Sequence, residues 1–190
     1  MKGKQYKIGL GIKEVASFEK IFNDINIEWE IVENPRAKIV KLAEENIGKP
    51  YKYGASVSKD APDFFDCSSF TNWLYVQAGI TLPRISVDQY VFSEEVSKEN
   101  AKAGDLIFSN SHRNIRNVFH KESVEFKPGT SVPKSIDHCG IYTGDEVIHA
   151  NEKMGCVNKE RILESEYFQD IVSIRRVKEA DEARYVMILE

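Results

Sequence analysis

The chain has 190 residues, 42% of them hydrophobic and 29% charged, which is enough apolar surface for one sizeable folded domain. Its formal net charge of −4 argues against a nucleic-acid-binding protein, because phosphate affinity comes mainly from clustered lysines and arginines. Three cysteines are too few for a disulfide framework, and no apolar run approaches the length of a membrane span. No apolar signal segment is visible, so we expect a cytoplasmic protein, or a secreted or cell-envelope one if a leader has been removed.

Residues 1–34 are expected to form an N-terminal extension packed on a main domain over residues 35–190. The extension combines a predicted strand at Tyr6–Ile12, a helical pattern around Ser17–Ile25 and the alternating stretch "NIEWEIVE". The main domain begins with a predicted helix, because Asn34 can cap it and Pro35 suits its first position. Its apolar residues recur at helical spacing up to Ile47, and Gly48 with Pro50 ends it.

A second helix is predicted from Cys67 to Ala78, after a loop rich in Gly, Ser, Asp and Pro. Asp66 stands at the capping position, which places Cys67 in the first turn, and Gly79 is a suitable stop. The remaining chain predicts strands at "AGDLIFS", "SIDHCGIYTGDEVIHAN" (two strands and a turn), "VSIRRV" and "RYVMIL". One or two helices followed by several strands indicate an α+β fold with helices on one side of an antiparallel sheet.

The predicted hairpin brings two histidines together if its turn has two residues. A type II′ turn centred on Gly144 and Asp145 would pair Gly140 with His149. His149 would then lie on the same face as His138, as its diagonal neighbour, and one imidazole could orient the other. A three-residue loop would instead place the two histidines on opposite faces.

The position of Cys67 favours a nucleophile. A free thiol is mostly protonated at neutral pH, but a helix N-terminus and an adjacent imidazolium both favour the thiolate. Nucleophile, base and orienting group together are the parts of acyl transfer through a covalent intermediate. A structural role for a buried cysteine stays open, as does a zinc site, although no C-x₂-C or H-x₃-H spacing supports one; its four candidate ligands are Cys67, His138, His149 and Cys156. Cys139 alternates with His138 and is expected in the core, and His112 and His120 are expected to be exposed.

Five stretches in order resemble the NlpC/P60 cysteine peptidases, which have a papain-like fold: "IGKPYKYGA", "FDCSSF", "LPRISVDQY", "AGDLIF" and "DHCGIYTGDEVIHAN". The similarity runs from about Pro35 to Val177. Two positions depart from the family pattern, since Ala55 and Ser69 stand where the family commonly has glycine. The segment of about residues 109–136 is longer than the usual connector, and we expect an inserted loop beside the cleft that selects or occludes substrate.

The resemblance implies that Cys67 is the nucleophile, His138 the general base and His149 the polar group that holds the ring of His138. It implies substrate-binding roles for Tyr51, Asp66 and Ser86, although Asp66 has a rival role as helix cap. The backbone N–H of Cys67 is the expected oxyanion donor.

The expected activity is hydrolysis of an amide bond in cell-wall peptides, at a γ-D-glutamyl–diamino-acid link, through an acyl-enzyme. The expected partner is a peptide or peptidoglycan-fragment substrate, with no nucleic acid, no membrane span and no cofactor or metal. Two alternatives are a thiol amidase or acyltransferase on a non-wall substrate, and a catalytically inactive binding module.

Overall fold

The computed structural model describes residues 6–11, 14–15, 28–111 and 136–189. Their main feature is a six-stranded sheet in which every neighbouring pair is antiparallel, with the strand order β3-β8-β4-β5-β6-β7. In chain order its strands are β3 (Glu94–Val96), β4 (Leu106–Asn110), β5 (His138–Tyr142), β6 (Glu146–Asn151), β7 (Cys156–Arg161) and β8 (Asp170–Arg176). The α+β prediction is confirmed.

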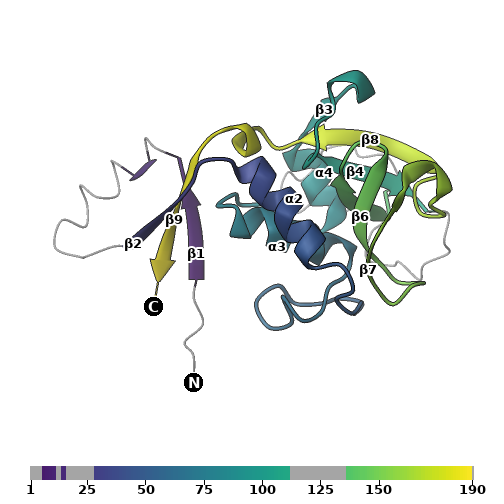
Figure 1. Ribbon diagram of the computed structural model, residues 1–190, viewed down its shortest axis with the longest axis horizontal. Helices are drawn as coiled ribbons and strands as arrows, with labels where there is room; N and C mark the ends of the chain where they lie inside the picture. Colours follow the sequence, from purple (N-terminus) through teal and green to yellow (C-terminus); the bar gives the residue numbers. More distant parts are fainter. Residues whose placement is uncertain (1–5, 12–13, 16–27, 112–135, 190) are drawn as a thin grey trace.

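In the described residues, three α-helices lie on one side of this sheet (Figure 1). They are α2 (Pro35–Glu45), α3 (Cys67–Gln77) and α4 (Ser86–Phe92). Helix α3 packs on β5 and β6, α2 packs on α3, and α4 places the ring of Tyr90 against Phe108 of β4. The described part of the chain also contains three short 3-10 helices: η1 (Lys98–Asn100), η2 (Ile162–Glu164) and η3 (Lys178–Asp181).

The sheet is buried on both faces because consecutive side chains of a strand point to opposite faces, and here many side chains on both faces are apolar. Leu106, Phe108, Cys139 and Ile141 face α3 and share a core with Phe70, Leu74 and other residues of the helices. Ile107, Tyr142, Val147 and Ile174 face the other way and pack against Ile162, Tyr167 and Phe168. The helices therefore cover one face, as predicted, and the connection between β7 and β8 covers the other.

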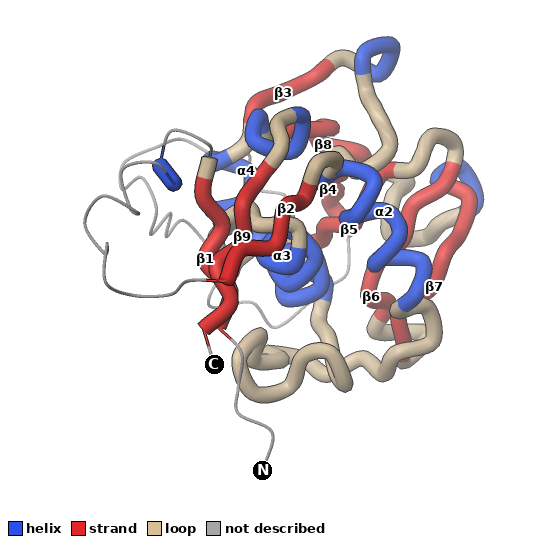
Figure 2. Tube along the Cα trace, turned by 60° about the vertical axis from the view of Figure 1, so that its left-hand side comes forward, coloured by secondary structure: helices blue, strands red, loops and turns tan. Residues whose placement is uncertain are grey.

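A small second sheet joins the two ends of the chain (Figures 1 and 2). Its order is β1 (Tyr6–Leu10), β9 (Arg184–Leu189) and β2 (Glu28–Val32), so the predicted strand "RYVMIL" pairs with the N-terminal strands. The sheet touches the end of α3, where Gly9 lies so close to Gly79 that a Cβ on Gly9 would come within 1.6 Å of the Gly79 carbonyl oxygen. The division into an extension and a main domain stays a prediction.

The two predicted helices begin where their caps indicated. Asn34 accepts a hydrogen bond from the Ala37 N–H, and Asp66 accepts one from Ser69. Helix α2 ends at Glu45, before Ile47, which is 45% exposed. The sequence did not predict α4, β3 or β7. The predicted helix around Ser17–Ile25, the insertion at about 109–136 and the predicted exposure of His112 and His120 fall largely or wholly outside the described residues.

Candidate active site

Cys67 is the first residue of α3, and its free thiol is half-buried. The backbone N–H groups of a helix's first turn have no partner inside the helix, so they favour negative charge at this end. Asp66 fixes the start of the helix through a hydrogen bond that its Oδ1 accepts from the Ser69 N–H at 2.7 Å. The prediction that Cys67 lies in the first turn is confirmed.

Ser69 completes a reciprocal cap with Asp66. Its hydroxyl accepts a hydrogen bond from the Asp66 N–H at 2.8 Å and donates one to the Asp66 carbonyl at 3.2 Å. The side chain is fully buried and takes up no space in the pocket described below. A serine at this position therefore strengthens the helix start beside the cysteine.

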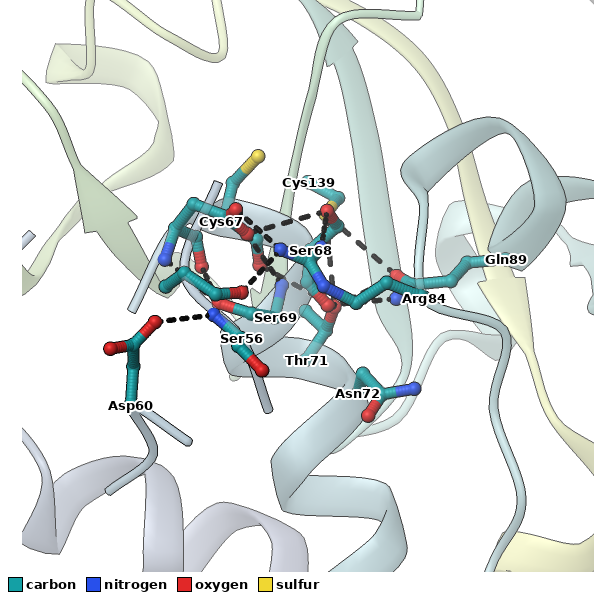
Figure 3. A network of polar contacts seen from close by, with 12 residues as sticks. Ser56, Asp60, Cys67, Ser68, Ser69, Thr71, Asn72, Arg84, Gln89 and Cys139 are labelled. Carbon is teal, nitrogen blue, oxygen red and sulfur yellow. Dashed lines mark hydrogen bonds and ion pairs between the residues drawn. The ribbon is translucent and has the colours of Figure 1, made fainter. Parts of the chain in front are cut away.

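Two residues from the stretch "LPRISVDQY" brace the same helix start (Figure 3). Arg84 donates to Asp66 Oδ2 at 2.6 Å, to Ser68 Oγ at 2.8 Å and to the Ala55 carbonyl at 2.7 Å. Gln89 donates to the Ser68 and Pro83 carbonyls and accepts from the Thr71 hydroxyl. Neither residue was assigned a role from the sequence. Their contacts explain why this polar stretch accompanies the cysteine helix.

The two histidines meet as the two-residue turn predicted. Ile141 pairs with Ile148, a register that sets Gly140 opposite His149. The Nε2 of His138 and the Nδ1 of His149 are 2.7 Å apart, and the rings are almost perpendicular. Gly140 makes this approach possible, because a Cβ there would lie 3.0 Å from the His149 Cβ and 2.8 Å from Val147.

One pocket of about 340 Å³ contains five of the six site residues predicted from the sequence. Cys67, His138, Tyr51, Asp66 and Ser86 all line it, together with Tyr53, Gly54, Ser68, Arg84, Ile85, Asp137, Glu152 and Tyr167. The sixth, His149, is fully buried and reaches the pocket only through its contact with His138. The structure thus brings the predicted set together, with five residues around the pocket and His149 behind His138.

Tyr51 stays neutral near this thiol. Burial raises the pKa of its phenol, and the negative charges of Cys67 and Glu152 raise it further. Its hydroxyl is therefore available as a hydrogen-bond donor at the mouth of the site.

Glu160 is a residue of this site that the sequence did not reveal. Its Oε1 lies 2.8 Å from His149 Nε2, on the far side of the ring from His138. The signal that could have found it is a second hairpin, β6–β7, in which Val147 pairs with Glu160 and His149 with Asn158. The polar run "CVNKER" of β7 does not stand out as a strand, and so this pairing was missed.

Cys139 lies on the helix side of β5, fully buried, as predicted. Burial raises the pKa of its thiol, and a hydrogen bond with Cys67 raises it further, so Cys139 stays protonated. Within the described residues, no group of three or more His, Cys, Asp or Glu side chains is arranged to hold a metal ion. None of the helices in those ranges is long and apolar enough to cross a bilayer.

Comparison with known proteins finds a family match and several similar sequences. A profile described as the NlpC/P60 family matches residues 48–120. The bifunctional muramidase/DL-endopeptidase CwlT of Bacillus subtilis is 32% identical over 74% of this chain and 36% of its own length. A probable endopeptidase p60 of Listeria seeligeri is 34% identical over 73% of this chain and 22% of its own. The gamma-DL-glutamyl hydrolase of B. subtilis is 33% identical over 56% of this chain and 21% of its own length.

Solved structures agree in fold. An NLP/P60-family protein of Staphylococcus aureus, described as similar to lipoprotein, has a TM-score of 0.56 at 33% identity, covering 75% of this chain and 41% of that one. The NlpC/p60 domain of the peptidoglycan hydrolase SagA has a TM-score of 0.54 at 26% identity, covering 75% of this chain and 98% of the domain. The chain spans only 21% to 36% of the length of these three curated relatives, but nearly all of that isolated domain.

Proposed function

Since this chain belongs to the NlpC/P60 family, we propose that it is a cysteine peptidase that hydrolyses an amide bond in peptidoglycan peptides. One observation carries the proposal: Cys67 at a helix start and His138 line the same pocket, with His149 hydrogen-bonded behind His138. A thiol, an imidazole and a group that orients the imidazole are the parts required for acyl transfer.

In the proposed reaction, the proton of the Cys67 thiol moves to His138, and the sulfur attacks the carbonyl carbon of the scissile amide. We assign stabilisation of the oxyanion of the tetrahedral intermediate to the backbone N–H of Cys67 and the neutral hydroxyl of Tyr51, because both residues line the pocket. His138 then returns the proton to the leaving amine, and the C–N bond breaks to leave a thioester. Water, deprotonated by His138, hydrolyses the thioester to release the acid and restore the thiol.

The charges around the pocket support a substrate with a free amine. Three carboxylates, Asp66, Asp137 and Glu152, line it, whereas the only lysine or arginine among the described lining residues is Arg84. Arg84 is already bound to Asp66. We propose that the cleaved bond is a γ-D-glutamyl–diamino-acid link and that Asp66 and Ser86 contact the substrate amine. The similarity to the gamma-DL-glutamyl hydrolase, at 33% identity, is consistent with this choice.

Asp66 has two tasks in this proposal. Its Oδ1 caps α3 and also accepts from the Ser68 hydroxyl at 3.5 Å, and its Oδ2 accepts from Arg84. A carboxylate has about four lone-pair directions, so these bonds leave room for one more donor. The residue is 7% exposed and faces the pocket, which leaves an edge for the substrate.

The test is an assay with purified muropeptides that differ in their third residue, with products identified by mass spectrometry. Cleavage between D-glutamate and a diamino acid, lost in Cys67→Ala, is the expected result. Cleavage at another wall-peptide bond would keep the enzyme class and change the specificity. Inactivity on every wall peptide would overturn the proposal and favour a thiol amidase or acyltransferase with a different substrate. The compartment predicted from the sequence is not addressed by this assay and stays a prediction.

A further inference from the structure

A carboxylate, that of Glu160, contacts the inner member of the histidine pair His138 and His149. Glu160 lies on β7, whose residues 158 and 160 share a face with residues 147 and 149 of β6. The cross-strand register makes Glu160 the diagonal neighbour of His149, and its Oε1 lies 2.8 Å from His149 Nε2. The four groups therefore form an ordered series from the pocket into the protein: Cys67, His138, His149 and Glu160.

The carboxylate of Glu160 is held in place by neighbours on both oxygens. The hydroxyl of Ser165, which is 1% exposed, donates to Oε1, and the Asn158 amide donates to Oε2 at 3.3 Å. Partial burial by itself would raise the pKa of Glu160. The hydrogen bonds from His149, Ser165 and Asn158 outweigh burial and hold the pKa below its usual value. Glu160 is ionised at neutral pH and can only accept hydrogen bonds.

An acceptor at this end decides where each proton in the line sits. The Nε2 of His149 must carry a hydrogen, because it faces an ionised carboxylate. Burial lowers the pKa of His149, although the charge and hydrogen bond of Glu160 oppose this, so its ring is neutral and its Nδ1 has a lone pair. The Nε2 of His138, 2.7 Å away, must therefore donate to it. The Nδ1 of His138 is left with the lone pair that can take a proton.

We propose that Glu160 is a positioning residue that sets the tautomers of His149 and His138 and stabilises the positive charge on His138 when the Cys67 proton arrives there. The inference rests on the proposed function. Its step moves one proton from the Cys67 sulfur to His138 Nδ1, which leaves a thiolate and an imidazolium. The negative charge of Glu160 acts on that imidazolium through the neutral ring of His149, in a region with little water.

The surroundings of the line leave Glu160 as the charged group in direct contact with His149. Tyr167 and Phe168 pack their rings on both histidines, with centroids 4.4 to 5.4 Å away. Other titratable groups lie near His138 around the pocket: Cys67 of α3, Asp66 before it, Tyr51, Asp137 before β5, Glu152 after β6 and Tyr167. These can shape the pH profile of the site, but among the described residues none of them has a hydrogen bond to His149.

The variant Glu160→Gln tests the proposal, because it keeps the shape of the side chain and removes its charge. The first readout is the rate of Cys67 alkylation by iodoacetamide, followed from pH 5 to 9 without substrate. We expect the Gln variant to need a higher pH than the wild type to reach half of its maximal rate. The second readout is wall-peptide cleavage, where kcat should fall at least about 10-fold with little change in KM, as expected when an orienting carboxylate is lost.

Two further variants separate positioning from structure. Glu164→Gln changes an exposed glutamate of the adjoining 3-10 helix η2 that is paired with Arg161. It should leave both readouts unchanged. Glu160→Asp keeps the charge at a shorter reach and should recover part of the alkylation profile, and it provides the test if the Gln variant does not fold. An alkylation profile that is the same in the wild type and in every folded Glu160 variant would overturn the proposal, even if the melting temperature fell. Because alkylation needs no substrate, failure of the peptidoglycan assignment would leave this result readable.

Discussion

Two carboxylates in this protein, the fully buried Asp105 and the partly buried Glu160, accept hydrogen bonds from cationic or ionisable partners but serve different purposes. Asp105, at the start of β4, is fully buried and accepts hydrogen bonds from Arg36 at 2.8 Å and from Arg176 at 2.7 and 3.0 Å. These contacts tie α2 and β8 to the residue that precedes β4, and Arg36 also binds Asp181 of η3. Glu160 instead has a histidine as its main partner, and that histidine leads to the pocket.

The difference lies in whether the partner can release a proton. A guanidinium is charged throughout the physiological range, so the Asp105 cluster has one state and serves only to join elements. An imidazole exchanges its proton near neutral pH, so a carboxylate behind it changes where the proton sits. We therefore expect changes in the histidine line (Cys67, His138, His149 and Glu160) to alter chemistry. Changes at the Asp105 cluster should alter stability.

The largest effect should come from cutting the histidine line at its nucleophile. Cys67→Ala should lower kcat for the wall peptide by about 10⁴-fold or more, because the covalent route is lost. The melting temperature should stay within a few degrees, since the side chain is only half-buried. Steady-state kinetics and thermal melts check both statements. Substantial residual turnover would mean that another group is the nucleophile.

The second effect should appear in stability alone. Asp105→Ala should lower the free energy of unfolding by about 3–5 kcal/mol, because Arg36 and Arg176 are largely buried and would keep only the more exposed Asp181 as an acidic partner. Urea denaturation measures the loss, and activity per folded molecule should be unchanged. Asp63→Ala is a matched control, since Asp63 is exposed and its ion pair with Lys49 is long, at 3.9 Å. Its loss should cost less than about 1 kcal/mol of unfolding free energy. Equal losses in the two variants would contradict a special role for Asp105.

A smaller effect is expected at the start of α3, next to the nucleophile. Ser69→Ala removes the acceptor of the Asp66 N–H and should cost about 1–2 kcal/mol of unfolding free energy, because that buried donor is left unpaired. Ser58→Ala, at an exposed serine, should stay within about 0.5 kcal/mol. Denaturation of both variants decides the point, and an unchanged Ser69→Ala would show that the reciprocal cap adds nothing to stability.

The smallest effect is a pH dependence of stability that we expect from His149. Burial holds the pKa of His149 in the folded protein below its usual value of 6.5. Its contribution to stability is therefore full above about pH 6.5 and is lost as the pH falls through the lower, folded-state pKa. Urea denaturation at several pH values between 7.5 and 5 should show this loss in the wild type and a smaller one in His149→Gln. The same slope of unfolding free energy against pH in both proteins would contradict a contribution from His149.

Local signals predicted much of the fold and most of the site. The cap and proline at Asn34 and Pro35, the cap at Asp66 and the glycine turn at Gly144 each act within a few residues. Such signals fix where a helix starts and which residues face each other in a hairpin. For this reason the placement of Cys67 and the meeting of His138 with His149 both followed from the sequence.

Other features depended on partners far along the chain. Helix α4 has seven residues and no side-chain cap, and β7 is polar, so neither has a strong local pattern. Arg84 and Glu160 are charged residues whose roles come from groups 18 and 11 positions away. The pairing of β9 with β1 joins the two ends of the chain, which no local pattern indicates.

The sequence by itself determined a cysteine at a helix start, two histidines on one face of a hairpin and an α+β fold, because short-range sterics and hydrogen bonds decide these. The tertiary structure alone decided that Cys67 and His138 open into one pocket, that Arg84 and Gln89 brace the helix start, and that Glu160 stands behind His149. It also gave Ser69 its reason, as the buried half of a reciprocal cap. These arrangements arise only when separate elements pack, since a buried polar group takes whichever partner the fold brings within reach.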